Sequence, residues 1–284
     1  MNSFTDARLR DIHFGSSFGK TFSTCDCNKN IYPMHINSQM VILPFLNRYL
    51  IKACFLNTIY ILRRGKVNNM KKTITIVGAG PGLGNHIARK FGTEGFKVIL
   101  MARNATKLAH YVTELTSEGI DAEYQTIDVS SDDSIKSSFN EAKNKYGRID
   151  VMVYNVAMMQ ANRPLELTAS ELLTHYQTDV AGALTAAQQV IPMQKEAHAG
   201  TLLFTGGGFA SFPAATNTTM SLDKAALHNL TMILAQALKS DGIFSGIVTI
   251  TGQIGQDEHF SPANIAEKYW QLYTQRESNE VIYE

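Results

Sequence analysis

Short apolar runs alternate with amphipathic stretches from residue 70 to the end of this 284-residue chain. Several runs are almost wholly apolar, which is typical of strands covered by helices on both faces of a parallel sheet. The runs that predict strands are 73–77, 97–101, 122–128, 149–154, 201–205, 246–250 and 280–283. This alternation predicts the α/β fold class, with a single doubly wound domain around a mostly parallel seven-stranded sheet flanked by helices.

Helix start signals stand between these runs. Thr168 and Glu171 have the spacing of a capping box, in which each side chain bonds the other residue's backbone N–H. Ser261 is followed by Pro262. Proline is favoured at the first helical position, directly after the capping residue. Ser131 is followed by two aspartates, and acidic residues are favoured in a first helical turn. These signals predict helices that begin near 132, 169 and 262.

The first 69 residues differ in composition from the rest. They contain 9 Lys and Arg, 3 Asp, no Glu and all three cysteines. The apolar run 41–62 is long enough to suggest a membrane span, but Arg48 and Lys52 near its middle are costly in a bilayer, so no membrane association is expected. We predict that translation starts at Met70, that 1–69 is disordered or a mis-assigned start, and that 70–284 is the domain.

The segment 70–284 has 17 Lys and Arg against 22 Asp and Glu, and it contains no cysteine. A disulfide framework is therefore excluded for this segment, and a cytoplasmic location is expected. Its acidic balance, without a basic stripe interleaved with aromatics, argues against nucleic-acid binding. The histidines are scattered, so no metal site is expected.

A glycine-rich turn follows the first strand. Residues 77–84 read VGAGPGLG, and the apolar residues Leu83, Ile87 and Phe91 predict a helix directly afterwards. Glycines make the turn tight and allow the backbone to approach a pyrophosphate, and the helix amino terminus offers N–H groups to that anion. A strand before the glycines and a helix after them favour a dinucleotide site.

The spacing of Gly78, Gly82 and Gly84 resembles that of the short-chain dehydrogenase/reductase family, and the resemblance extends over 72–284. It implies a Rossmann-type oxidoreductase with a nicotinamide cofactor that assembles as a homodimer or homotetramer. Residues 153–157, VYNVA, stand where the family usually reads Asn-Asn-Ala-Gly. The cofactor-binding residues it implies are Gly78, Gly80, Gly82, Leu83, Gly84, Arg103, Asp128, Val129, Asn155, Lys224 and Gly252.

Arg103 indicates which cofactor is used. The place for an acidic residue that holds a ribose 2′-hydroxyl carries Ala102, followed by Arg103. A carboxylate there would repel a 2′-phosphate, whereas a guanidinium pairs with it. The sequence therefore favours NADP(H) over NAD(H), and the alternative interpretation of Arg103 is an ordinary surface arginine.

The catalytic positions depart from the family three times out of four. The family's tyrosine, serine and asparagine fall on Met220, Gly207 (within one residue) and Asp179, and only Lys224 remains. A thioether donates no proton and glycine has no side chain, so the usual acid–base and oxyanion groups are missing.

Other groups nearby in the sequence are candidates to replace the missing tyrosine and serine. Ser221 shares a helix face with Lys224, and His175 and Tyr176 precede Asp179. We expect the last two to be surface or packing residues. Residues 206–208 offer either backbone N–H donors or open space beside the nicotinamide.

The sequence is compatible with three functions. The first is an NADP(H)-dependent oxidoreductase that transfers hydride between the nicotinamide and a small carbonyl or alcohol substrate, with a non-standard catalytic centre. The second is a non-catalytic NADP(H)-binding regulator or partner subunit. The third is an enzyme that uses the cofactor for epimerisation or for reduction of an activated double bond.

Overall fold

Seven strands form one sheet in the order β3-β2-β1-β4-β5-β6-β7, and every neighbouring pair is parallel. The computed structural model describes residues 71–284. The expectations about Met70, about 1–69 and about the run 41–62 lie outside the described residues. Within the described part, the doubly wound sheet is confirmed.

All seven strands fall on the predicted runs. They are β1 Thr73–Val77, β2 Lys97–Ala102, β3 Ala122–Thr126, β4 Val151–Tyr154, β5 Gly200–Gly207, β6 Ile243–Ile250 and β7 Glu280–Tyr283. β5 and β6 extend beyond their predicted runs because they pair with each other over their whole lengths. β3 ends before the predicted 128 because Asp128 turns the chain, accepting hydrogen bonds from the backbone and side chain of Ser130.

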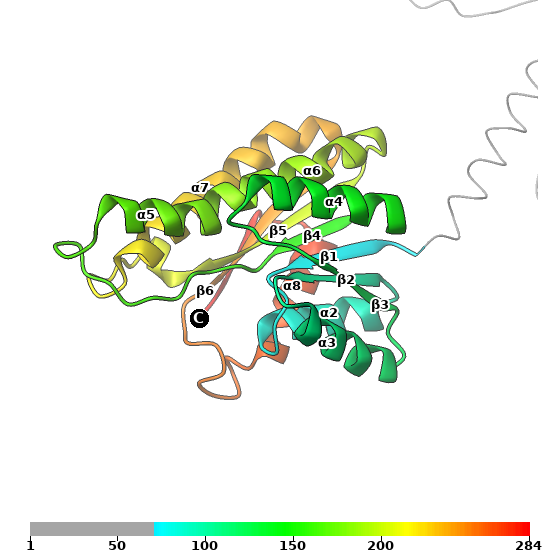
Figure 1. Ribbon diagram of the computed structural model, residues 1–284, viewed down its shortest axis with the longest axis horizontal. Coiled ribbons are helices and arrows are strands. Elements are labelled where there is room, and N and C mark those ends of the chain that lie inside the picture. Colours follow the sequence, from blue (N-terminus) through cyan, green and yellow to red (C-terminus); the bar gives the residue numbers. More distant parts are fainter. Residues whose placement is uncertain (1–70) are drawn as a thin grey trace, which may run out of the picture. The chain divides into compact units, whose positions relative to one another are not determined.

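The helices cover both faces of the sheet (Figure 1). They are α2 Leu83–Thr93, α3 Ala105–Ser117, α4 Asp132–Tyr146, α5 Ala169–Tyr176, α6 Gly182–Glu196, α7 Thr218–Leu238 and α8 Pro262–Gln275, with a π-helix η1 at Gln177–Ala181. Side chains of α2, α3 and α8 form one apolar core layer with the sheet, and those of α4, α6 and α7 form the other. The single tryptophan packs in the first layer, 5.2 Å between ring centroids from Phe91.

The predicted helix starts are confirmed at three places. Thr168 caps α5 and makes the reciprocal capping box with Glu171. Ser131 caps α4, and Ser261 caps α8 with proline in its first turn. At each of these starts the cap is made by a side chain to a backbone N–H three residues later.

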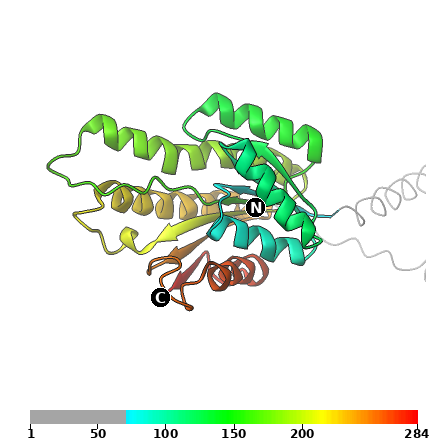
Figure 2. The same cartoon turned by 60° about the horizontal axis from the view of Figure 1, so that its bottom comes forward.

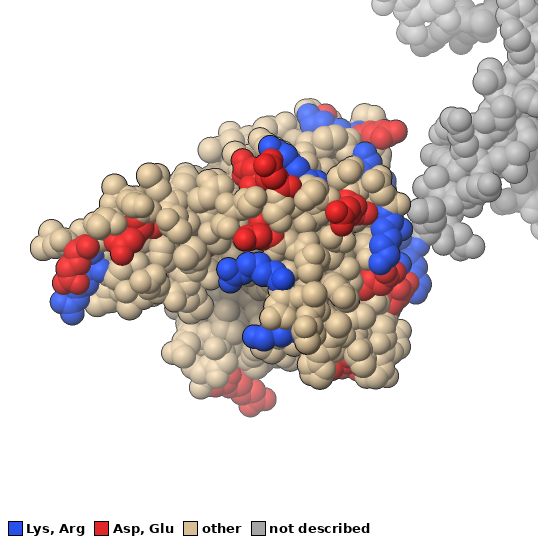
Figure 3. All heavy atoms as spheres, viewed as in Figure 1, with Lys and Arg blue, Asp and Glu red and all other residues tan. Residues whose placement is uncertain are grey.

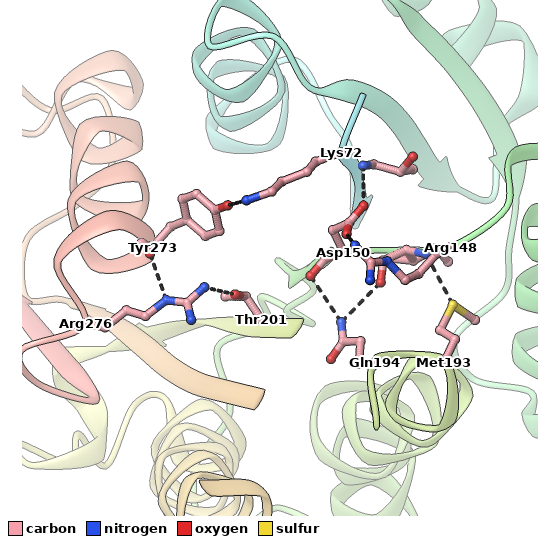
Figure 4. Close-up of polar contacts among 10 residues, drawn as sticks. Lys72, Arg148, Asp150, Met193, Gln194, Thr201, Tyr273 and Arg276 are labelled. Carbon is pink, nitrogen blue, oxygen red and sulfur yellow. Dashed lines mark hydrogen bonds and ion pairs between the residues drawn. The ribbon is translucent and has the colours of Figure 1, made fainter. Parts of the chain in front are cut away.

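Polar contacts hold the amino ends of the central strands together (Figure 4). The Asp150 carboxylate accepts a hydrogen bond from the backbone N–H of Thr73 at 2.8 Å and pairs with Arg148. On the other side, the Arg276 guanidinium donates to the hydroxyl of Thr201 at 2.9 Å. These contacts stabilise the edge of the sheet formed by the amino ends of the strands. Parallel α/β sheets bind ligands at the opposite edge, formed by the carboxyl ends.

Two long segments extend past the carboxyl edge and lie side by side (Figures 1 and 2). They follow β4 and β5, at 155–168 and 208–217, and a parallel bridge joins Asn162 to Asn217. The side chain of Asn162 also accepts from the backbone N–H of Thr219 at 3.0 Å and donates to its hydroxyl at 2.7 Å. These bonds position the first turn of α7, which carries Met220; Lys224 follows one turn later.

No helix within 71–284 is both long and apolar enough to cross a membrane. Over the same range, no cluster of three His, Cys, Asp or Glu side chains is arranged to hold a metal ion.

Candidate functional site

A cleft of about 750 Å³ opens at the carboxyl edge of the sheet. The space-filling view shows the surface hollowed on this face, with Lys and Arg side chains near the hollow (Figure 3). Its wall is mostly apolar and brings together six of the sequence-predicted site residues: Leu83, Asn155, Gly207, Met220, Lys224 and Gly252. A volume of this size suits a cofactor ring and a small substrate.

The glycine turn between β1 and α2 fits a close-approaching ligand. Gly78 has a φ of +86°, and a Cβ on it would lie 2.6 Å from the carbonyl oxygen of Asn155. Gly84 is needed for packing too, because its Cβ would lie 2.9 Å from the carbonyl oxygen of Gly78. A Cβ on Gly80 or Gly82, in contrast, would meet nothing within 4 Å.

The start of α2 beside this turn also fits an anion. Gly82 occupies the N-cap without a side-chain cap, and the first turn of the helix has no acidic residue. The N–H groups at such a terminus favour a phosphate. The residues present therefore fit a dinucleotide, with Gly80 and Gly82 as the open positions.

We predict that alanine substitution affects Gly78 and Gly80 differently. Gly78→Ala is expected to lower the free energy of unfolding by about 1–3 kcal/mol, because it places a side chain at positive φ against backbone. Gly80→Ala is expected to keep the stability of the unsubstituted chain and to weaken NADPH binding. Urea unfolding and calorimetric titration of the two variants check this, and equal destabilisation by both would contradict it.

A second, smaller cavity of about 400 Å³ lies at the carboxyl ends of β2 and β3. Arg103 and Asp128 line it, together with Ser134 and Ser137. The side-chain and backbone hydrogen bonds from Ser130 lower the pKa of Asp128, and the charge of Arg103 lowers it further. Arg103 is exposed, and within 71–284 its guanidinium makes no hydrogen bond or ion pair.

Val129 does not reach either cavity through its side chain, which is 8% exposed and packs in the core. The predicted cofactor residues thus fall into three groups: those on the large cleft, those on the second cavity, and the glycine turn with Val129.

Asn155 connects the cofactor turn to the inner sheet. Its amide donates to the carbonyl oxygen of Gly78 at 3.1 Å, and its carbonyl oxygen accepts from the hydroxyl of Thr205 at 2.8 Å. The ammonium of Lys224 donates to the carbonyl oxygen of Thr205 at 2.7 Å. A run of hydrogen bonds therefore links the glycine turn, β4, β5 and α7. Sequence reasoning missed Thr205, which carries no distinctive motif.

Gly207 is the glycine of the 206–208 run that faces Lys224. A Cβ on it would lie 3.5–3.7 Å from the aliphatic carbons of Lys224, an ordinary contact distance. A Cβ on Gly206 would lie 2.8 Å from Oγ1 of Thr249, and one on Gly208 would lie 3.2 Å from the backbone of Thr251. Position 207 thus has the side-chain direction that a serine beside the lysine needs.

Met220 and Lys224 lie one helical turn apart on α7, and both line the cleft. Met220 is 6% exposed, and its thioether supplies no proton. Burial lowers the pKa of the Lys224 ammonium, while the charges of Asp179 and Asp223 oppose that shift. Among the described residues that line the cleft, Lys224 is the ionisable one.

Asp179 lies behind the cleft wall rather than on it. It sits in the π-helix, is 2% exposed, and accepts from the backbone N–H of Met158 at 2.9 and 3.1 Å. Burial raises the pKa of Asp179, and the nearby ammonium of Lys224 lowers it. Its carboxylate thus braces the segment after β4, which forms part of the cleft wall.

The suggested substitutes for tyrosine do not line the cleft. The hydroxyl of Ser221 donates to the carbonyl oxygen of Asn217 at 2.8 Å and accepts from the N–H of Ala214 at 3.1 Å, so it is occupied in the start of α7. Tyr176 is 41% exposed, as a surface residue is, whereas His175 is 3% exposed and packed inside.

The sequence profile of the short chain dehydrogenase family matches residues 72–253. The chain belongs to the short-chain dehydrogenase family, a family of oxidoreductases. An uncharacterised oxidoreductase of Staphylococcus aureus (strain USA300) is 25% identical over 172 residues, which cover 61% of this chain and 74% of that one.

Solved structures share the family's fold. A metagenomic short-chain oxidoreductase in complex with NADP superposes with a TM-score of 0.69 at 24% identity, covering 75% of this chain and 96% of that one. A variant of actinorhodin polyketide ketoreductase with NADPH gives 0.69 at 21% identity, covering 75% and 95%. At these identities the likeness establishes the fold.

Proposed function

We propose that this family member is an NADP(H)-dependent oxidoreductase that transfers hydride between the nicotinamide and a small carbonyl or alcohol substrate. The observation that carries the proposal is Lys224, which is buried at the inner wall of the cleft and tied through Thr205 and Asn155 to the glycine turn. One continuous set of contacts would then hold the cofactor and present an ammonium group to the substrate.

Residues of three segments would hold the cofactor. The backbone of Gly80–Leu83 would receive the pyrophosphate, and Asp128 with the backbone of Val129 would receive the adenine. Asn155, Lys224 and Gly252 would hold the nicotinamide riboside. When bound, the cofactor supplies or accepts the hydride. The protein must then protonate the oxygen of the reduced carbonyl, since an alkoxide is a costly product.

Lys224 is the group proposed to do this. Burial lowers the pKa of its ammonium, which makes it a stronger acid than an exposed lysine. Met220 and Gly207 replace the family's phenol and hydroxyl, so no phenol stands between Lys224, which lines the cleft, and the substrate. The apolar side chains of Met159, Phe212 and Ile254 favour a substrate with an apolar body next to its carbonyl.

Arg103 is proposed to select NADP(H) by pairing with the 2′-phosphate. Replacing it with Ala is expected to weaken NADPH binding by about tenfold or more, which is what losing one charge-assisted contact costs, and to leave NADH binding nearly unchanged. Calorimetric titrations with both cofactors check this. An equal loss of affinity for NADPH and NADH would contradict a role of Arg103 in cofactor selection.

A second candidate is a non-catalytic NADP(H)-binding regulator or partner subunit. Met220 and Gly207 favour it, because general acid–base catalysis contributes typically about 10²–10⁴-fold and an oxyanion donor about 10²–10³-fold. In that case Lys224 serves cofactor binding only.

Self-association and a cytoplasmic location belong to the same proposal. Leu173 on α5 and Leu222 and Ile233 on α7 are 66%, 49% and 60% exposed, which supports a subunit contact along these helices. A homodimer or homotetramer would cover them.

The experiment that tests the function is NADPH consumption by the full chain with aldehydes, ketones and quinones, beside a cofactor-induced thermal shift. Consumption with formation of the alcohol supports the oxidoreductase. Stabilisation by NADPH with no consumption on any substrate supports the regulator. No stabilisation by NADPH or NADH would defeat both.

A further inference from the structure

A carboxyl group that the proposed reaction does not use is buried next to Lys224. Asp223 is 0% exposed. Within the described chain, neither of its carboxyl oxygens has a hydrogen-bond partner. An ionised carboxylate without partners is costly to bury, whereas the neutral acid is much less so. The geometry therefore favours a protonated Asp223.

Two ionisable side chains act on this carboxyl, and a third acts on one of those two. Asp179 comes from the π-helix and Lys224 from α7 itself, and the charges of both act on Asp223. His175 comes from α5, acts on Asp179, and is buried with its Nδ1 unpartnered in the described chain. The other side of α7 packs on β5 and β6, whose sequences contain no titratable residue.

Asp223 and Lys224 are neighbours without being an ion pair. Asp223 lies three residues and Lys224 four residues after Met220, so both lie on the helix face that Met220 shares. The ammonium of Lys224 nevertheless donates to the carbonyl oxygen of Thr205. Asp223 can therefore change its protonation without breaking a hydrogen bond of Lys224.

We propose that Asp223 is a positioning residue for Lys224: as a neutral acid it leaves Lys224 able to give up its proton to the cleft, and as a carboxylate it holds that proton on Lys224. The inference rests on the proposed function, in which Lys224 protonates the substrate oxygen. At Asp223 itself only the O–H bond breaks; the proton goes to water and the carboxylate keeps the electron pair.

The direction of the pH effect follows from burial. Burial, helped by the charge of Asp179 and opposed by that of Lys224, raises the pKa of Asp223 from 3.8 to about 7. Because the folded-state pKa is the higher one, the stability that Asp223 contributes is fully present below pH 3.8 and is lost as the pH rises to about 7. Above pH 7 the added negative charge raises the pKa of Lys224, and the reduction rate falls.

The first test compares the full chain with its Asp223→Asn variant, in which the side chain stays neutral at every pH. Infrared spectra should show a protonated carboxyl band that disappears near pH 7 in the unsubstituted chain and is absent from the variant. Urea unfolding should show that the unsubstituted chain loses stability as the pH rises from 3.8 to about 7 and that the variant loses less. Asp133→Asn, at an exposed carboxylate in α4, is the matched control and should behave as the unsubstituted chain.

The second test observes Lys224 directly. In the chain labelled with ¹³C at lysine Cε, the signal of Lys224, assigned by its loss in Lys224→Met, should show an inflection near pH 7 that Asp223→Asn removes. Asp223→Ser, also neutral, repeats the test if Asn disturbs packing. A Lys224 titration that neither variant changes would overturn the inference, as would a protonated carboxyl band that survives both. Neither readout needs turnover, so a chain that shows the coupling but no turnover would overturn only the proposed function.

Discussion

The double variant Met220→Tyr with Gly207→Ser is expected to raise kcat/KM for NADPH-dependent reduction of an aldehyde or ketone by about 10²-fold or more. A phenol at position 220 would lie one helical turn before Lys224, whose positive charge favours release of the phenolic proton. A hydroxyl at position 207 would add a donor to the developing alkoxide, a contribution typically of about 10²–10³-fold.

Both side chains fit the site. Met220 is a lining residue of the cleft, so we expect a tyrosine ring at this position to border its open space. The Cβ of a residue at 207 meets only the aliphatic chain of Lys224 at contact distance, and φ at this position is −158°, an extended value open to any residue. The fold should therefore remain intact in the double variant.

Two matched controls separate chemistry from packing. Met220→Phe supplies the ring without the hydroxyl and should bring no gain. Gly206→Ser supplies the hydroxyl one residue away, where its Cβ would lie 2.8 Å from Thr249 Oγ1, and should destabilise the chain without a gain. An equal gain from Phe and Tyr at position 220 would contradict the acid role.

Lys224→Met is expected to lower kcat/KM of the native chain by about 10²–10⁴-fold, the usual contribution of a general acid. The variant keeps a linear side chain of similar length, but it removes the donor to the carbonyl oxygen of Thr205. Calorimetry with NADPH should still detect binding, because the glycine turn and Arg103 are untouched. The loss should therefore appear in kcat more than in NADPH affinity.

Lys195→Met is the control for this prediction. Lys195 lies in the last turn of α6 and forms a partly exposed ion pair with Asp241. The substitution should leave turnover and binding unchanged. Full turnover by Lys224→Met would remove Lys224 from the chemistry, whereas loss of NADPH binding together with turnover would favour the regulator.

The sheet could be predicted from the sequence because its signals are local. Apolar runs such as 73–77 and 280–283 coincide with strands, and side-chain caps such as Ser131 begin their helices where expected. The glycine turn could be predicted for the same reason: strand, turn and helix follow one another within a few residues.

The arrangement behind the cleft could not be predicted this way. The burial of Asp223 depends on how α7 meets the π-helix, and the contact between Asn155 and Thr205 joins residues 50 positions apart. One signal was available: Asp223 follows Met220 by three residues, which places it on the same inward face of the helix. His175 was expected at the surface or in packing; its burial follows from the way α5 packs against α7.

The most direct test of the proposed oxidoreductase is hydride transfer itself. The full chain would be incubated with NADPH deuterated at C4 and with apolar aldehydes and ketones, and the alcohols would be analysed by mass spectrometry, with Lys224→Met in parallel. We expect deuterium on the carbinol carbon in the native reaction and its loss in Lys224→Met. Tight binding of NADPH with no deuterated alcohol from any substrate would contradict it.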